Sequence, residues 1–263
     1  MNFLLQFFHT ILYRPLLNLL ILFYAYLPGQ DFGLAVILLT LLIKVVLLPS
    51  SKKSVKSQQA MAKLQPKIKE AQEKFKGDRQ QQSIALMELY KKEKVSPVSG
   101  CLPLLLQLPI LIALYQVFLN VFKPEVIKDA LYGFVTMPAK INPNFLGLVD
   151  LSRPFTEKID EKTIYYWPVL LLALLTGLAQ FWQMKQTMPS LKKSEQKNKK
   201  KDGAPDFSHI MQKQMLYVFP ALLLFIILKF GSIIGLYILV SSLFSIGEHY
   251  FINRKAKPAE VEK

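Results

Sequence analysis

The chain has 263 residues, of which 52% are hydrophobic, and it carries a formal net charge of +15. Its mean hydropathy of +0.27 and its long apolar runs exclude an ordinary soluble protein and indicate a membrane protein with several spans. The single cysteine, Cys101, excludes an internal disulfide and a cysteine cluster for metal. The first 13 residues contain no Lys or Arg, and no A-x-A pattern follows, so we expect no removable signal peptide.

Residues 3–27 are long enough to cross a bilayer, but five polar or helix-disturbing residues interrupt them. These are Gln6, His9, Arg14, Pro15 and Asn18. We expect residues 1–30 to form a helix that lies in the membrane interface and turns at Pro28 and Gly29 into the first span. The alternative is a sixth span, which would move the N-terminus to the other side of the membrane.

Five further segments are apolar and long enough to cross the bilayer, and together they form a predicted core of residues 31–254. They cover residues 32–48, 101–122, 164–184, 214–230 and 232–252. We expect helices because backbone groups in lipid must bond within their own segment, and none of these runs alternates as a strand does. The segments between and after them cover residues 50–97, 123–163, 185–213 and 255–263.

The Lys and Arg content of these connecting segments predicts the orientation. Residues 50–97 contain 12 Lys or Arg, residues 123–163 contain 6, and residues 185–213 contain 8. The two richer segments should face the cytosol, which places the N-terminus outside and the C-terminus inside. Anionic lipid beside these segments accounts for the basic charge without nucleic acid, so we expect no DNA partner.

The first cytosolic segment, residues 50–97, has the pattern of a helical hairpin. Apolar residues recur at spacings of three and four, the pair Gly77-Asp78 interrupts them, and the pattern then resumes. We expect Pro66 to kink or divide the first arm because proline removes a helical hydrogen bond. The predicted fold class is an all-α membrane protein with a five-helix transmembrane core, an N-terminal interfacial helix and a cytosolic helical hairpin.

Lys44 lies inside an apolar stretch of the first span, about 7 Å from its cytosolic end at about 1.5 Å per residue. An ammonium in hydrocarbon costs about 3 kcal/mol or more, so it is usually paired, hydrated or functional. We expect a water-filled recess that opens to the cytosol and is sealed outside. Its candidate residues are Lys44, Gln107, Gln180, Gln183, Ser241 and Ser245. Two plainer interpretations stay open: Lys44 could extend to the lipid head groups, and the glutamines could simply decorate the interface.

The remaining polar residues give no sign of an enzyme, a cofactor or a metal site. His9, His209 and His249 match no metal-ligand spacing, and we expect them at the surface or in the membrane interface. Glu248 is the one acidic residue of the five predicted spans. We expect it in a solvated position near the cytosolic end.

Four stretches carry a resemblance to a known family. They are LLTLLIKVVLLP at 38–49, LQPKIKEAQEKF at 64–75, LYKKEKVSPVSGCLPLLLQLPILIALYQVF at 89–118 and MQKQMLYVFPALLLFIILKFGSIIGLYILVSSLFSI at 211–246. In order and spacing the chain resembles the YidC family of membrane protein insertases from about Asp31 to Arg254. The resemblance implies five core helices, a cytosolic hairpin, and a hydrophilic groove open to cytosol and lipid but closed outside.

The resemblance also implies roles for single residues. Lys44 stands where the family usually has an arginine, which keeps the positive charge but loses the planar fork that can bind two oxygens. Ile238 stands where relatives often have tryptophan, and Gln183 or Gln180 matches a polar groove residue of the third helix. The chain looks like the short form of the family, without a large periplasmic domain.

The hypothesis that follows is a membrane protein insertase and chaperone, not an enzyme, without a cofactor. Nascent transmembrane segments would enter the groove and slide into the bilayer of a bacterial cell membrane. Expected partners are nascent membrane proteins, the lipid bilayer, the ribosome through the basic hairpin, and a secretion channel. The alternatives are a small-solute transporter or channel, a membrane-bound enzyme, and an assembly factor that chaperones subunits without inserting them.

Overall fold

The protein is described by a computed structural model that covers most of the chain. It describes residues 3–75, 77–95, 102–138, 140–159, 162–187 and 207–256. Most of the predicted second cytosolic loop and tail, together with the link from the hairpin into the second span, lie outside the described residues.

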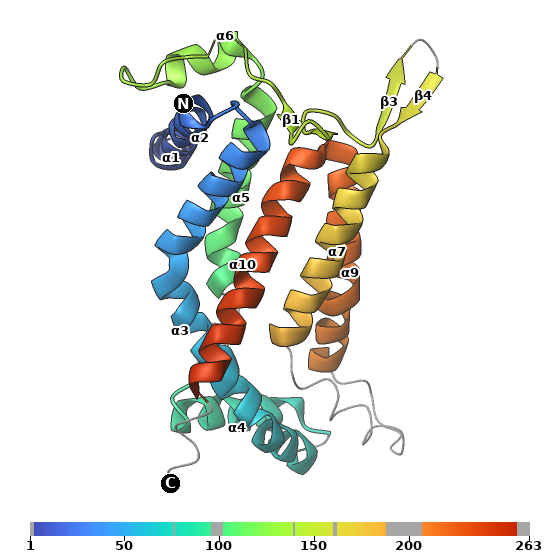
Figure 1. Ribbon diagram of the computed structural model, residues 1–263. Helices are drawn as coiled ribbons and strands as arrows, with labels where there is room; N and C mark the ends of the chain where they lie inside the picture. The colour runs from blue at the N-terminus through green and yellow to red at the C-terminus, as the bar shows by residue number, and fades with distance from the viewer. Residues whose placement is uncertain are drawn as a thin grey trace.

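Five helices form a bundle (Figure 1). They are α3 (Phe32–Lys74), α5 (Leu102–Asn120), α7 (Trp167–Thr187), α9 (Phe207–Phe230) and α10 (Ser232–Ala256). Within the described residues, four helical segments are long and apolar enough to cross a membrane, and two shorter ones are also apolar. The predicted class of all-α membrane protein is therefore confirmed.

Helix α10 occupies the centre of this bundle. It packs against α3 on one side and α7 on the other, while α9 packs against α7 (Figure 1). Gly235 allows a close approach there, because a β-carbon at this position would lie 2.9 Å from Cγ2 of Ile227 in α9. Side chains of α10 are consequently covered by neighbours over most of the helix, whereas many leucines of α7 and α9 stay exposed on the outside of the bundle.

Helix α3 continues far beyond the predicted first span of residues 32–48. Pro49 and Pro66 both lie inside its 43 residues. Pro66 was expected to kink or divide the first arm of the hairpin. It does not divide the arm, because the remaining helical hydrogen bonds carry the helix across the missing one, and the kink stays a prediction. One helix thus forms both the first span and the first arm of the hairpin.

The second arm of the hairpin is α4 (Arg79–Lys92). Asp78 caps it by accepting hydrogen bonds from the backbone N–H groups of Gln80 and Gln81, both at 3.0 Å. The arms are joined by an ion pair of 2.5 Å between Lys67 and Glu93. The predicted break at Gly77-Asp78 and the helical hairpin are therefore present.

The N-terminal residues form three helical pieces that lie across the bundle. They are α1 (Phe3–Phe8), the π-helical turn η1 (His9–Tyr13) and α2 (Arg14–Tyr26). Figure 1 shows α1 and α2 nearly end-on beside the start of α3, so their axis crosses the direction of the bundle helices. Leu17, Leu20 and Ile21 are fully buried against the bundle, whereas Leu5 and Phe7 are exposed. This placement is the one expected of an interfacial helix, which remains a prediction because length and composition also permit a span.

The segment between α5 and α7 covers the same end of the bundle. It contains α6 (Pro124–Ile127), the 3-10 turn η3 (Lys128–Ala130) and two antiparallel hairpins. The hairpins pair β1 (Asn144–Phe145) with β2 (Val149–Asp150) and β3 (Thr156–Ile159) with β4 (Lys162–Tyr165). The predicted third span, residues 164–184, therefore starts too early, because Ile164 and Tyr165 belong to β4.

Backbone and side-chain hydrogen bonds fasten this covering segment to the helices. Asn18 in α2 donates to the carbonyl of Ala130 at 3.0 Å and accepts from the N–H of Tyr132 at 2.7 Å. Tyr24 accepts from the N–H of Asn142 at 2.9 Å. Helix α2 therefore holds the covering segment in place over the bundle.

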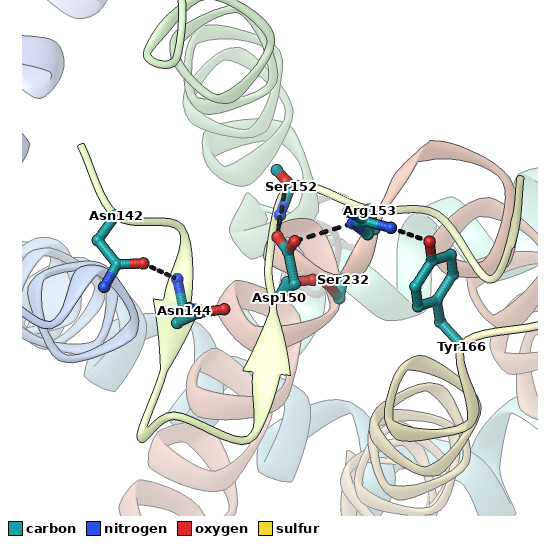
Figure 2. A network of polar contacts seen from close by, with 7 residues as sticks. All are labelled: Asn142, Asn144, Asp150, Ser152, Arg153, Tyr166 and Ser232. Atoms are coloured by element: carbon teal, nitrogen blue, oxygen red, sulfur yellow. Dashed lines mark hydrogen bonds and ion pairs between the residues drawn. The ribbon is translucent and has the colours of Figure 1, made fainter. Parts of the chain in front are cut away.

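A second group of contacts joins the covering segment to the start of α10 (Figure 2). Ser232 donates to the carbonyl of Asp150 at 3.0 Å, and the Asp150 carboxylate accepts from Ser152 and from Arg153. Arg153 also donates to the Tyr166 hydroxyl. Because Arg153 bonds to groups on both sides of the β3–β4 hairpin, the base of that hairpin is fixed above α10.

Asp31 joins the start of α3 to the β1–β2 turn. Its carboxylate accepts from the N–H of Leu34 at 2.9 Å, which caps α3, and from the N–H of Leu146 at 2.6 Å. Next to it, Gly33 packs directly under the Phe145 ring, and a β-carbon at position 33 would collide with that ring. One carboxylate and one glycine therefore fix the turn over the end of α3.

We expect Asp31→Ala to lower stability by about 2 kcal/mol, because a helix cap contributes about 1 kcal/mol and a charged hydrogen bond a similar amount or more. Thermal unfolding in detergent measures the loss as a lower Tm. Asp31→Asn, which keeps one acceptor oxygen, should lose less. Asp129→Ala, at an exposed carboxylate, is the control. A Tm for Asp31→Ala equal to that of the control would contradict the double role of Asp31.

Candidate functional site

Polar side chains collect on the buried surface of α10. From residue 241 onward, those with 9% exposure or less are Ser241, Ser242, Ser245, Glu248 and His249. Ser241, Ser245 and Glu248 recur at spacings of four and three, so they share one face of the helix, and Ser242 and His249 share the next. Two polar faces of one helix therefore point to two different neighbours.

The first face meets α3. Lys44 donates from Nζ to Oγ of Ser245 at 3.1 Å, and Ser245 donates to the carbonyl of Ser241 at 3.0 Å. Further along α3, Ser51 donates to Oε2 of Glu248 at 2.7 Å. We call Lys44, Ser51, Ser241, Ser245 and Glu248 the polar seam. The Lys44 ammonium thus points toward α10 and not outward along the helix surface.

The polar seam is extended by a contact from α5. Gln107 donates from Nε2 to the hydroxyl of Tyr237, which is 2% exposed. Tyr237 lies one turn before Ser241 on the same face of α10. Three helices, α3, α5 and α10, therefore contribute polar groups along this face of α10.

The second face of α10 meets α7. Ser242 donates to Oε1 of Gln180 at 2.6 Å, and Gln180 is 8% exposed. One turn earlier, Thr176 donates to the carbonyl of Gly235 at 3.2 Å. Gln180 is therefore bonded to a different face of α10 from the one that Lys44 meets.

The structure separates the six candidate groove residues into three places. Lys44, Ser241 and Ser245 lie together in the polar seam, and Gln107 adjoins it through Tyr237. Gln180 lies on the α7 side of α10. Gln183 is half-buried on α7, where its backbone carbonyl accepts a hydrogen bond from Thr187 at 2.9 Å. Their joint role in a groove stays a prediction.

Two expectations about the end of α10 are wrong. Glu248 was expected in a solvated position and His249 at the surface or in the membrane interface, yet each is buried within the bundle, with 9% exposure. For Glu248 the reason is the length of α3, which continues past its predicted span so that Ser51 donates to the Glu248 carboxylate. Within the described part of the chain, no three His, Cys, Asp or Glu side chains are placed to hold a metal ion.

Comparison with known proteins identifies a family that matches this chain. The sequence pattern of the family described as 60Kd inner membrane protein matches residues 23–260, nearly the whole chain. The chain belongs to this family. The predicted resemblance is thereby confirmed, and the chain is a multi-pass inner-membrane protein.

Curated proteins similar to this member of the 60Kd inner membrane protein family carry the name membrane protein insertase YidC. The protein from Syntrophobacter fumaroxidans is 34% identical over 94% of this chain and 38% of its own length. That from Lawsonia intracellularis is 34% identical over 94% of this chain and 39% of its own length. That from Geobacter sulfurreducens is 31% identical over 96% and 39%. The chain thus spans about two fifths of the length of these relatives.

Ser51 and Glu248 are the site residues of this family member that sequence reasoning missed. Ser51 follows the proline taken as the end of the first span, and Glu248 was assigned to solvent. The spacing of Ser241, Ser245 and Glu248 on one helical face was visible in the sequence. Their partner on α3 was not, because no local pattern says which helices become neighbours.

We expect Ser242→Ala to destabilise the protein by about 1 to 3 kcal/mol, because Oε1 of Gln180 would stay buried without its donor. Thermal unfolding in detergent measures the change. The double variant Ser242→Ala with Gln180→Leu should recover most of the lost stability, since both polar partners are then removed. If Ser242→Ala alone has the same Tm as the wild type, the contact contributes nothing to the packing of α7 on α10.

Proposed function

We propose that the chain is a membrane protein insertase in which the polar seam forms part of a groove open to the cytosol. Nascent transmembrane segments enter this groove and are released into the bilayer without an enzymatic reaction or a cofactor. The observation that carries the proposal is the Lys44 ammonium, which is held between α3 and α10 by Ser245. The names of the similar curated proteins support the same function.

The polar seam would act by keeping water in one half of the bilayer. Lys44, Ser245 and Gln107 offer donors and acceptors that favour hydration of their surroundings, so the polar flank of a substrate crosses only the remaining half. Lys44 would also attract acidic groups of the substrate. Attraction over about 4 Å at an effective dielectric constant near 20 is about 4 kcal/mol before desolvation is subtracted, which recruits a segment without trapping it.

The opposite half of the bundle supports a seal. The stretches 33–39, 167–175 and 222–228 contain no ionisable side chain. At the same end the covering segment is bonded to Asp31 in front of α3 and to Ser232 of α10. A channel or an alternating-access carrier instead places polar groups along the full path or near its middle. This asymmetry favours an insertase over a small-solute transporter.

The orientation and partners follow from charge. The hairpin end of the bundle, rich in Lys and Arg, faces the cytosol of a bacterial cell, with the N-terminus outside and the C-terminus inside. The basic hairpin then contacts the ribosome, whose RNA is anionic, and a secretion channel is a further partner. Residues 3–26 lie in the interface on the outer face of the inner membrane, and their exposed apolar side chains lie in lipid.

We expect Lys44→Ala to slow insertion of single-span substrates with acidic translocated tails by about tenfold, which corresponds to about 1.4 kcal/mol of lost attraction. The measurement reconstitutes the purified chain in vesicles and follows protease protection of the tail. Lys44→Arg should keep most of the rate because the charge remains. Lys52→Ala, which removes an exposed lysine of α3 outside the polar seam, is the matched control.

Equal insertion rates for Lys44→Ala and Lys52→Ala would show that Lys44 has no part in the mechanism. Absence of tail protection by the wild-type chain, together with flux of small solutes through the same vesicles, would replace the insertase with a transporter.

A further inference from the structure

Glu248 contains a buried oxygen atom that the polar seam leaves unused. Its Oε2 accepts a hydrogen bond from Ser51, whereas its Oε1 is buried without a hydrogen-bond partner. The residue as a whole is only 9% exposed. Buried carboxylate oxygens are costly unless a donor meets them, so this acceptor favours a group that supplies one.

The position of Glu248 relative to Lys44 gives the polar seam two ends of opposite charge. Glu248 follows Ser245, the partner of Lys44, by three residues, about 4.5 Å along α10 toward the hairpin end. The ion pairs shown among the described residues join Lys67 to Glu93 and Arg153 to Asp150, and none joins Lys44 to Glu248. Each charge is held by its own serine, and the attraction between Lys44 and Glu248 acts through space and not through a hydrogen bond.

We propose that Glu248 binds a lysine or arginine side chain in the cytosolic flank of the incoming transmembrane segment. This inference rests on the proposed insertase function and adds a second recognition group to it. Lys44 attracts the acidic residues that pass outward, and Glu248 retains the basic residues that stay inside. The polar seam thereby recognises the charge difference between the two ends of a segment.

The chemistry of the vacant oxygen selects the ligand. Ammonium and guanidinium groups donate charge-assisted hydrogen bonds to carboxylates, which are about twice as strong as neutral ones. Cytosolic flanks of membrane segments are enriched in Lys and Arg, so the matching group is present in the substrate class. Glu248 lies toward the hairpin end, where such a flank arrives.

The test compares Glu248→Gln with wild type in vesicles of phosphatidylcholine, which adds no surface charge of its own. Two single-span substrates are used that differ only in lysines or glutamines of the cytosolic flank. Glutamine retains the shape of the side chain and an oxygen for Ser51 but loses the charge. We expect the ratio of insertion rates, lysine flank over glutamine flank, to fall about tenfold in Glu248→Gln. Glu248→Asp, which keeps the charge, should retain the preference.

The outcomes separate the two levels of the proposal. If Glu248→Gln slows both substrates equally, or if Glu248→Asp loses the preference as well, Glu248 only supports packing and the inference is overturned. If wild type inserts both substrates at the same rate, the chain is an insertase that does not distinguish the charge of the flank, and the inference is overturned. If wild type protects neither substrate, the proposed function fails, and the inference fails with it.

Discussion

The free-energy cost of an ammonium away from water is the constraint on which the arrangement of this bundle depends. Lys44 sits on a helix whose neighbours along the chain are apolar, so a partner must come from another helix. Ser245 of α10 supplies it. The same helix face then supplies Ser241, Glu248 and, through Tyr237, a contact with Gln107. The central position of α10 and its polar face together supply the hydrogen-bond partners that a lysine inside the bundle needs.

Polar side chains are used differently at the two ends of the bundle. At the covered end, Asn18, Asp31 and Ser232 bond to backbone groups of one irregular segment, which satisfies that segment and holds the starts of α3 and α10. At the hairpin end, polar side chains meet inside the bundle itself. Fixed helix starts are therefore combined with charged side chains, Lys44 and Glu248, inside the bundle toward the hairpin, where the proposed mechanism uses them.

Sequence alone predicted the helices and the hairpin break at Gly77-Asp78, because both depend on the local pattern of residues. It also singled out Lys44 from its charge in an apolar run, and the role of that residue stays a prediction. It did not predict the burial of Glu248 and His249. Burial at a helix end depends on which neighbour covers it, and for Glu248 the neighbour is the part of α3 beyond Pro49. The division of the polar residues between α3 and α7 also depended on the rotation of α10, since Ser242 and Ser245 are three residues apart but bond to different neighbours, Gln180 of α7 and Lys44 of α3.

The uninterrupted course of α3 has a mechanical consequence. The helix that contains Lys44 also forms the first arm of the hairpin, with no loop between the two parts. Twisting of the arm about its axis is therefore transmitted to Lys44, whereas bending is taken up at Pro49 and Pro66, where the hydrogen-bond ladder is incomplete. A ribosome docked on the arm, as proposed, would therefore act on Lys44 through torque.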